Sequence, residues 1–450
     1  MTATLHEYQK PHVVSLLSSL LRNRVAHDGS DTGTGKTYAA AGVISTLDVE
    51  TLVVCPLSVV PTWEAVLAEF GCKHVTVINY EKAWRRLGHI QPWGNGSFFA
   101  WDDPVPVLFV FDEVHRSGGK TTINSKMLIA AKRTGALILT LSATVADTPL
   151  RMKAFGFVTG LHNGKDYLDW LLKCGAKPGT FGGWVWKSKE NEHVMRFLHE
   201  QLYGGPEGPG RGSRMRIADI PDFPQTQIEV RLLPCIDRQV VRLSKDLKAW
   251  YDERAVKGYQ SESELAQLTY FRQSLETAKI PAVVDMVEDA LETSRVVIFT
   301  NFNRTVDELI AICKKRNWTC GFVRGEQSTS KGGLAQRAKF IADFQANKLD
   351  VLLCNIQAGG VGVSFHDPVT QVARTTIILP TFSSVALKQA LGRAQRDGGG
   401  FSRQLLVYFS QGLEGAIAKI VRNKLNSLHL LNDAELCGDF RQTIHLTDES

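Results

Sequence analysis

Short apolar runs alternate with amphipathic segments along most of the chain. In the first half the apolar runs occupy 51–56, 75–80, 105–113 and 136–144. Helix-like segments such as 61–70 and 125–133 lie between these runs. Because near-continuous apolar strands separated by amphipathic helices are typical of a buried parallel sheet, this half is predicted to form an α/β domain.

The second half repeats the pattern. Its apolar runs occupy 295–302, 319–325, 349–356, 375–381 and 404–410, with helix-like segments at 305–316 and 334–345. A run at 226–234 is expected to open this block as a strand, with antiparallel pairing as one option, and 236–292 is expected to be mostly helical. Two α/β lobes in one chain are the simplest account.

Glycine and proline are concentrated at 203–214, between the two blocks. Such a composition is typical of a loop or hinge. The expected organisation is therefore a first domain at 1–202, a linker and crossover at 203–225, and a second domain at 226–450.

The composition is that of a soluble globular protein. The chain has 450 residues, of which 44% are hydrophobic and 22% charged, and its formal net charge of +6 is compatible with a polyanionic partner. No apolar run reaches the roughly 18 residues of a membrane span, and the N-terminus lacks a secretory signal. The eight cysteines form no CxxC pair. We expect no membrane association, no secretion, and a cytoplasmic or nucleoid-associated location, or a nuclear one in a eukaryotic or viral host.

The strongest local motif is SDTGTGKT, residues 30–37. Glycines at 33 and 35 allow a tight turn whose N–H groups converge on phosphate oxygens, and Thr32 and Thr34 belong to the same loop. Lys36 would supply a positive charge to the β- and γ-phosphates of ATP, and the Thr37 hydroxyl would bind Mg²⁺. Serine replaces the usual first glycine of this motif at position 30, as suits helicase-type loops.

A second motif, VLFVFDEVH, ends an apolar run with two adjacent carboxylates. Parallel sheets hold their ligands at the carboxyl ends of the strands, where Asp112 and Glu113 are expected. Asp112 would hold Mg²⁺ through water, and Glu113 would orient and deprotonate the water that attacks ATP.

The third motif, QALGRAQR, runs from Gln389 to Arg396. Arg393 and Arg396 are three residues apart and would share one face of a helix. A guanidinium inserted at the γ-phosphate stabilises the charge of phosphoryl transfer. Arginines supplied by a second lobe would complete the catalytic site only when the cleft closes, which would link hydrolysis to movement.

Together these motifs resemble helicase superfamily two, and within it the Swi/Snf-type DNA translocases. The resemblance adds LHEYQ (5–9), VVCPLSVVPTWEAVLAEF (53–70), INYEKAWR (78–85), LSAT (141–144), SRMRIADIPDFPQTQIEV (213–230), AKIPAVVDMVEDAL (278–291), IFTNF (298–302) and IQAGGVGVSF (356–365). The motifs follow the family's order through nearly the whole chain. The implied fold is two RecA-like domains, with parallel sheets flanked by helices and an ATP cleft between them.

The resemblance also implies roles for further residues. Gln9 would read the adenine, and Gln389 would join the two arginines of its motif in catalysis. His115, Ser142 and Thr144 would couple the ATP site to the nucleic-acid track. The track itself would be lined by Pro56, Ser58, Asn301, Gly359 and Gly360.

Some positions depart from the Swi/Snf pattern. Val114 occupies the third position of the DEAH-like motif, Gly392 replaces the usual acidic residue, and RDGGG follows the last motif. No histone-reading, zinc or other accessory module is evident. These departures favour a compact motor of bacterial, phage or viral type over a chromatin remodeller.

The predicted function is a nucleic-acid-stimulated ATPase that uses ATP and Mg²⁺ to translocate on DNA, with sequence-independent duplex DNA as its track and a regulatory protein as a further candidate partner. One alternative is a strand-separating or branch-migrating helicase on DNA or RNA, for which Trp184 and Trp186 are candidate stacking groups. Another is a scaffold that binds nucleic acid or a partner without turnover.

Overall fold

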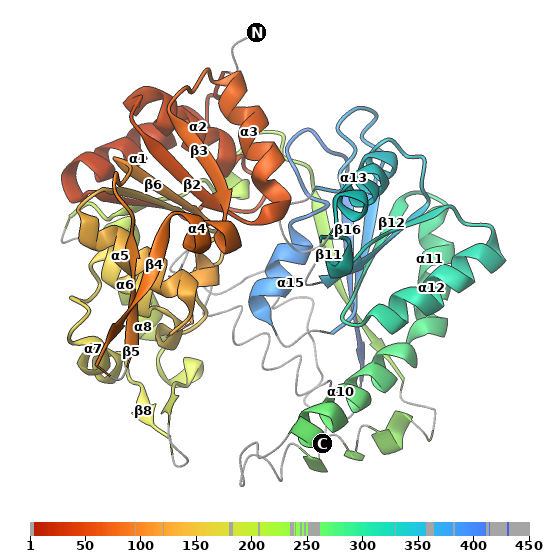
Figure 1. Cartoon of the computed structure of the whole chain (residues 1–450). Helices are drawn as coiled ribbons and strands as arrows, with labels where there is room; N and C mark the ends of the chain where they lie inside the picture. Colours follow the sequence, from red (N-terminus) through yellow and green to blue (C-terminus); the bar gives the residue numbers. More distant parts are fainter. Residues whose placement is uncertain are drawn as a thin grey trace. The chain divides into compact units, whose positions relative to one another are not determined.

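The chain divides into two compact units. Unit 1 contains Met1–Pro221 and Lys424–Leu436, and unit 2 contains Asp222–Asn423 and Cys437–Ser450. The computed structural model describes residues 4–94, 96–119, 121–179, 183–205, 208–234, 238, 240–243, 245–246, 249–250, 262–328, 330–356, 364–380, 383–410, 414 and 430–431. Each unit is built around one six-stranded parallel sheet (Figure 1).

The sheet of unit 1 has the strand order β10-β1-β7-β6-β2-β3, and all neighbours pair in parallel. These strands are β10 (Gly212–Ser213), β1 (Val25–Asp28), β7 (Leu137–Leu141), β6 (Leu108–Asp112), β2 (Thr51–Cys55) and β3 (Val75–Asn79). Their carboxyl ends therefore meet at one edge of the sheet, where the loops that carry the candidate motifs begin.

Helices cover both faces of this sheet. One face packs against α1 (Gln9–Asn23), α2 (Lys36–Leu47) and α3 (Val60–Glu69). The other packs against α4 (Tyr80–Arg86), α5 (Ile123–Thr134), α6 (Lys153–Thr159) and α8 (Glu192–Tyr203). On β6, Leu108 and Val110 join the first core and Phe109 and Phe111 the second, so the strand is apolar at successive positions because both of its faces are buried.

Two antiparallel pairs stand apart from this sheet. The hairpin of β4 (Gly88–Trp93) and β5 (Gly96–Trp101) follows α4, and the short strands β8 (Lys177–Pro178) and β9 (Trp184–Val185) follow α7 (Tyr167–Lys173). Neither pair was predicted from the sequence.

The sheet of unit 2 has the order β11-β16-β15-β12-β14-β13 and is also parallel throughout. Its strands are β11 (Thr226–Leu233), β16 (Ser402–Phe409), β15 (Arg374–Ile378), β12 (Arg295–Thr300), β14 (Val351–Asn355) and β13 (Cys320–Val323). The antiparallel option for the strand at 226–234 is wrong. β11 pairs in parallel with β16 along its whole length, from Thr226 opposite Ser402 to Leu233 opposite Phe409.

The helices of unit 2 are α10 (Glu262–Thr277), α11 (Ile280–Leu291), α12 (Asn303–Arg316), α13 (Lys331–Gln345) and α15 (Ser384–Leu391). α11 and α12 pack their apolar faces on β12, β14, β15 and β16 to form one core. The expected helical character of 236–292 is seen in α10 and α11, and 251–261 lies outside the described residues.

A buried carboxylate joins α10 to the sheet of unit 2. Glu276 is 3% exposed and accepts hydrogen bonds from the backbone N–H groups of Asn301 and Phe302, from Asn301 Nδ2 and from Thr305 Oγ1. These donors lie at the start of α12, where backbone N–H groups lack partners within the helix. Glu276 thus acts as a helix cap supplied by another helix.

The segment 203–225, expected to be a linker, belongs largely to unit 1. Within it β10 pairs in parallel with β1, and η5 (Ile217–Asp219) follows. The end of the chain also differs from the expected second domain at 226–450. Leu430 and Leu431 are buried in the core of unit 1, where the Leu431 carbonyl lies 3.0 Å from His199 Nδ1.

Both units are α/β domains of the RecA-like kind, as predicted. Among the described residues, no helix combines the length and the apolar character needed to cross a bilayer.

Replacing Glu276 with alanine is expected to lower the free energy of unfolding by about 3 kcal/mol or more, because several buried donors would lose their acceptor. Glu288→Ala is the matched control, since Glu288 pairs with Arg316 at the surface and should contribute about 0–1 kcal/mol. Urea unfolding followed by circular dichroism measures both. Equal effects of the two substitutions would contradict the capping role.

Candidate functional site

Residues 29–35 form the loop between β1 and α2, at the carboxyl edge of the sheet in unit 1. Gly33 and Gly35 have φ values of 101° and 85°, in the left-handed region that glycine adopts without strain. α2 begins at Lys36, and Thr37 lies half-buried in its first turn. The loop therefore has the glycine geometry and the following helix of a phosphate-binding loop.

The Lys36 ammonium is directed into this loop. Its Nζ donates hydrogen bonds to the carbonyl oxygens of Ser30 at 2.9 Å and Asp31 at 3.0 Å. Its charge also acts on the carboxylates at the strand ends, because it lowers the pKa of both Asp28 and Asp112. The lysine is thus close to the loop backbone and to the candidate catalytic carboxylate.

Gln9 lies against the loop. Its side chain is 2% exposed, with Nε2 donating to the Thr34 carbonyl at 3.2 Å and Oε1 accepting from the His6 N–H at 3.0 Å. A Cβ at Gly35 would come within 2.4 Å of Gln9 Nε2 and would displace the end of that side chain from the loop. Gln9 therefore supports the loop directly, a role the sequence did not suggest.

A buried polar cluster lies beneath the loop. Asp28 is fully buried, and its carboxylate accepts from the Ser30 N–H at 2.9 Å and lies 3.1 Å from His12 Nε2. Burial by itself raises the pKa of Asp28, but the charge and hydrogen bond of His12, with Lys36 and Ser30, outweigh it and hold that pKa at about 2. His12 Nδ1 lies 2.8 Å from Ser213 Oγ, which ties the cluster to β10.

The segment after β10 is attached to the loop itself. Arg214 forms an ion pair with Asp31 at 2.8 Å and donates to the Gly29 carbonyl at 3.1 Å. The backbone N–H of Met215 donates to Ser30 Oγ at 2.9 Å. The chain that leads toward unit 2 is therefore fixed to the start of the phosphate loop. Sequence reasoning gave these residues no place in the site.

Asp112 ends β6 at the same edge of the sheet. Its Oδ2 accepts from Trp63 Nε1 at 2.9 Å, its Oδ1 accepts from the Glu113 N–H at 2.9 Å, and its carbonyl accepts from Tyr80 Oη at 2.8 Å. Burial and the neighbouring Glu113 charge raise the pKa of Asp112 to about 6, against the lowering effects of Trp63 and Lys36. The carboxylate is mainly ionised at neutral pH and keeps further lone pairs for a cation.

Glu113 has a φ of 54°, which is uncommon for a residue with a side chain. This conformation turns the chain directly after β6 into η2 (Val114–Ser117). Glu113 Oε2 lies 3.3 Å from His115 Nδ1. Backbone strain at a carboxylate of this kind is typical of a functional position.

The three predicted coupling residues are brought together. His115 Nδ1 lies 3.2 Å from Ser142 Oγ, and Ser142 Oγ accepts from the Thr144 N–H at 3.1 Å. The Ser142 N–H in turn donates to the Asp28 carbonyl at 3.0 Å. Glu113, His115 and Ser142 therefore form a continuous chain of contacts across the ends of β6 and β7.

Of the five residues predicted to line a nucleic-acid track, the structure describes Pro56, Ser58 and Asn301. Pro56 follows β2 and Ser58 lies in η1 (Leu57–Val59), beside the end of β6 in the sheet order. In unit 2, Asn301 Nδ2 donates to Glu276 and to the Pro380 carbonyl, so its amide hydrogens are engaged within the fold. Gly359 and Gly360 lie outside the described residues.

The arginine motif of unit 2 does not form one helix face. α15 ends at Leu391, with Gly392 as its C-cap, so Arg393 and Arg396 lie in the turn beyond it and only Gln389 is helical. The Arg393 carbonyl accepts from the Phe365 N–H at 2.9 Å, which fixes the turn. Gln389 and Arg393 are buried, at 6% and 3% exposure. The expected shared helix face is therefore wrong, because α15 ends at Leu391, before both arginines.

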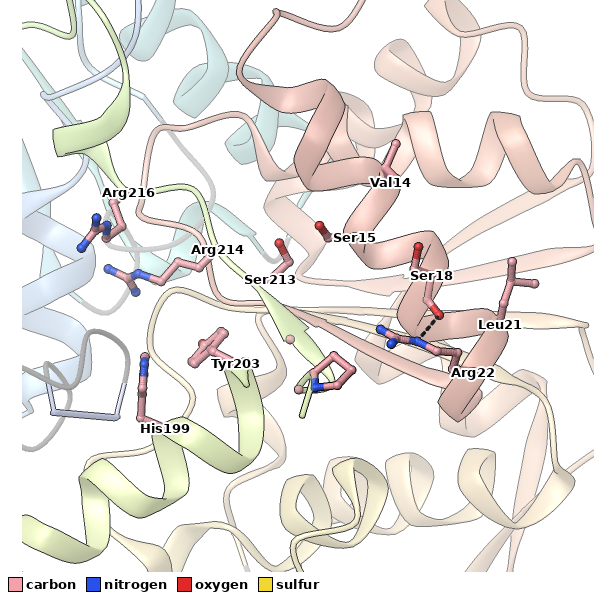
Figure 2. A pocket seen from close by; sticks show the side chains of 13 residues that line it. Val14, Ser15, Ser18, Leu21, Arg22, His199, Tyr203, Ser213, Arg214 and Arg216 are labelled. Atoms are coloured by element: carbon pink, nitrogen blue, oxygen red, sulfur yellow. Dashed lines mark hydrogen bonds between the residues drawn. The ribbon is translucent and has the colours of Figure 1, made fainter. Parts of the chain in front are cut away.

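A groove of about 850 Å³ follows the outer side of β10 (Figure 2). It lies between α1 and the end of α8, and Arg22, Tyr203 and Ser213 are among its lining residues. Arg214, which also lines the groove, holds the first part of the phosphate loop through Asp31. The segment 212–216 thus forms a wall between this groove and the loop.

In the described part of the chain, no three histidine, cysteine or carboxylate groups cluster as a metal cage. Mg²⁺ usually binds through one or two protein ligands together with substrate phosphates. The Thr37 hydroxyl and the Asp112 carboxylate are oxygen donors of the type this ion prefers, at the loop expected to hold those phosphates.

Comparisons with known proteins agree with this geometry. Residues 278–398 match the family model described as Helicase conserved C-terminal domain. The chain is 29% identical over 465 positions to an Acanthamoeba polyphaga mimivirus protein provisionally described as an ATP-dependent RNA helicase, covering 97% of this chain and 85% of that protein. The structure of S. cerevisiae Dbp5 bound to RNA and ADP BeF3 matches with a TM-score of 0.50 at 13% identity, covering 97% of this chain and 91% of that one. The sequence matches show that the chain is similar to helicases, over residues 278–398 for the family model and over nearly its whole length for the viral protein, and the structural match shows the same fold.

Asp28→Asn is expected to destabilise the chain at pH 7 by about 2 kcal/mol. The pKa of Asp28 is lowered from the usual 3.8 to about 2, so its stabilising contribution is present above about pH 4 and is lost as the pH falls toward 2. Urea unfolding at pH 7 and at pH 2.5 should therefore show a smaller loss on acidification for Asp28→Asn than for the wild type.

The control is Asp48→Asn, at an exposed αL position after α2 that asparagine tolerates. It should change the free energy of unfolding at pH 7 by less than about 0.5 kcal/mol. If Asp28→Asn lost as much free energy of unfolding as the wild type between pH 7 and pH 2.5, the stabilising role of the buried Asp28–His12 pair would be refuted.

Proposed function

We propose that the chain is a nucleic-acid-stimulated ATPase motor of the helicase type. One observation carries the proposal. The loop with Lys36 follows β1 and the Asp112–Glu113 pair ends β6, and only β7 lies between these two strands in the sheet. A phosphate-binding lysine, a metal-binding carboxylate and a candidate base are thereby brought to one edge of unit 1, in a chain whose residues 278–398 match a helicase C-terminal domain.

In this proposal the loop residues Thr32–Thr37 and the Lys36 ammonium hold the phosphates of ATP. Thr37 and Asp112 hold Mg²⁺, which neutralises charge on the phosphate oxygens when it is bound. Glu113 orients the attacking water and accepts its proton, and His115, 3.3 Å from that carboxylate, fixes its direction. Trp63 and Tyr80 position Asp112 through its side chain and its carbonyl.

Unit 2 would supply the remaining groups. Arg393 and Arg396 would stabilise the charge that develops on the γ-phosphate, and Gln389 would support them, when a cleft between the two units closes on ATP. Gln9 would read the adenine from the position it holds beside Thr34. Arginines held on a separate unit make hydrolysis depend on closure, which is the requirement for converting it into movement.

The nucleic acid would bind mainly through its phosphates, without sequence preference. Pro56 and Ser58 of unit 1, with the backbone and Oδ1 of Asn301 and with Gly359 and Gly360, are the proposed contacts. The described function of the viral relative favours an RNA track. The Swi/Snf-like segment 53–70, whose Trp63 holds Asp112, favours duplex DNA as the second candidate. We further propose a cytoplasmic, nucleoid-associated or host-nuclear location and a regulatory protein partner.

The first test is ATP hydrolysis without nucleic acid and with RNA, single-stranded DNA or duplex DNA. Lys36→Ala is expected to lower the stimulated rate by about 100-fold or more, because the phosphate charge loses its fixed counter-charge. Lys73→Ala, at an exposed position after α3, should keep the wild-type rate.

Each outcome of this test has a definite meaning. Stimulation mainly by RNA would support the RNA-directed motor, and stimulation mainly by duplex DNA the translocase. A wild-type rate that no nucleic acid raises would refute the proposed motor. Full activity of Lys36→Ala would refute the assignment of the phosphate loop.

Ser142→Ala tests the coupling chain. Without its hydroxyl, His115 and the Thr144 N–H lose their shared partner, so strand displacement should fall by roughly tenfold while hydrolysis falls by less than about threefold. Ser125→Ala is the matched control, because this buried hydroxyl of α5 has no hydrogen-bond partner among the described residues. Parallel losses of both activities in Ser142→Ala would argue against a coupling role.

A further inference from the structure

The hairpin of β4 and β5 carries an exposed tryptophan beside its turn. Trp93 pairs with Gly96 in the last register position of the hairpin, and its side chain is 76% exposed. By contrast, the tryptophans first considered as stacking groups, Trp184 and Trp186, are partly buried against other aromatic side chains, and Trp186 Nε1 donates to the Cys174 carbonyl. Trp93 is therefore the tryptophan whose ring faces solvent at a projecting turn.

The hairpin is anchored along β5, from Trp101 at its base to Ser97 next to its turn. Phe99 and Trp101 of β5 are buried in the core of unit 1, and Trp101 Nε1 donates to the Met127 carbonyl of α5 at 3.1 Å. Lys126 Nζ donates to Ser97 Oγ at 2.6 Å. A Cβ at Gly88 would come within 2.3 Å of the Phe99 ring, so the two strands approach closely. Because this support is rigid, the exposed ring loses little conformational entropy when it binds a ligand.

The charge of this region suits a polyanion. No acidic residue occurs in the 20 residues between Glu81 and Asp102, whereas Lys82, Arg85 and Arg86 do. All three side chains are exposed in α4, directly before the hairpin. The cations lie before the base of the hairpin and Trp93 lies at its turn, so the length of β4 separates them. Proteins bind single-stranded nucleic acid with such a combination along one strand, because cations attract the backbone and rings stack on bases.

The hairpin is also tied to the candidate ATP site. Tyr80, the first residue of α4, donates its hydroxyl to the Asp112 carbonyl at 2.8 Å. Arg116, after Glu113, lies over the Tyr80 ring at 5.9 Å and 3.7 Å from Glu81. β4 begins two residues after α4 ends. A change at the Asp112–Glu113 turn is thereby passed through one short helix to the hairpin.

We propose that Trp93 stacks on an unpaired base of a single-stranded nucleic acid, with Lys82, Arg85 and Arg86 binding phosphates further along the same strand. This assignment rests on the proposed function and adds a binding site outside the track residues named above. The stacked base is held away from its complementary strand, so the hairpin acts as a wedge during strand separation. RNA and single-stranded DNA share this chemistry, and the two are compared in the test.

The test compares the affinities of the full chain for two single strands of about 12 nucleotides, one with bases and one abasic. Fluorescence anisotropy is measured for RNA and for DNA. Trp93→Ala should weaken binding of the base-bearing strand by about tenfold and leave the abasic strand unaffected, since only the stacking is lost. Trp93→Phe should stay within about threefold of the wild type, because phenylalanine keeps an aromatic face.

Phe197→Ala is the matched control, because Phe197 is an exposed aromatic residue of α8, at 54% exposure, outside the hairpin. It should bind like the wild type, and unchanged thermal unfolding of Trp93→Ala would show that its fold is intact. Equal binding by the wild type and Trp93→Ala would overturn the stacking site while leaving the motor in place, and would point to a protein partner for the exposed ring. A wild type that binds neither strand, with no nucleic-acid stimulation of hydrolysis, would overturn both proposals.

Discussion

The parallel pairing of β1, β7 and β6 is the constraint on which the candidate site depends. Asp28 pairs with Leu141, and Leu141 pairs with Asp112, so the three strands end level with one another. The loops that follow them carry the phosphate-binding lysine, the Ser142–Thr144 pair and the Asp112–Glu113 pair. A shift of one residue in this register would reverse the faces of a strand and separate these groups. The chemistry of unit 1 is thus fixed by backbone pairing before any ligand binds.

Three buried carboxylates of the chain differ in how strongly their surroundings stabilise the charged form. Asp28 has a lowered pKa because His12, Lys36 and the Ser30 N–H outweigh its burial, whereas Asp112 has a raised pKa because burial and the Glu113 charge outweigh Trp63 and Lys36. Burial also raises the pKa of Glu276 in unit 2, although four donors form hydrogen bonds with its carboxylate. The ionised Asp28 carboxylate therefore stabilises the folded chain beneath the phosphate loop. The protein alone stabilises the Asp112 anion less than the Asp28 anion. A bound cation would therefore stabilise the charged form of Asp112 more.

The apolar runs predicted most of the sheet strands, because strands buried on both faces have a strong signal. β1 was not predicted from its own residues, since VAHD has two polar members among four, yet it carries the phosphate loop. The hairpin was missed because Pro92 lies within its first strand, a position that disfavours a strand assignment.

Motifs identified Lys36, Asp112 and Glu113. Their supporting partners could not be read from motifs, because Trp63 and Met215 lie 49 and 185 residues from the groups they bind. The helix face expected for Arg393 and Arg396 was wrong because α15 ends at Leu391, with Gly392 as its C-cap.

The site is connected outward in two directions by short, rigid links. On one side, Arg214 and Met215 attach the segment after β10 to the phosphate loop, and unit 2 begins at Asp222, only a few residues later. On the other side, Tyr80 attaches α4 and the hairpin to the end of β6. A small rearrangement on hydrolysis needs a stiff path to be felt at a distance, because packed elements transmit displacements while loose loops absorb them. Both links consist of hydrogen bonds, and in one case an ion pair, within unit 1. In the proposed motor, these links would connect the state of the nucleotide site to the start of unit 2 and to the exposed ring of Trp93.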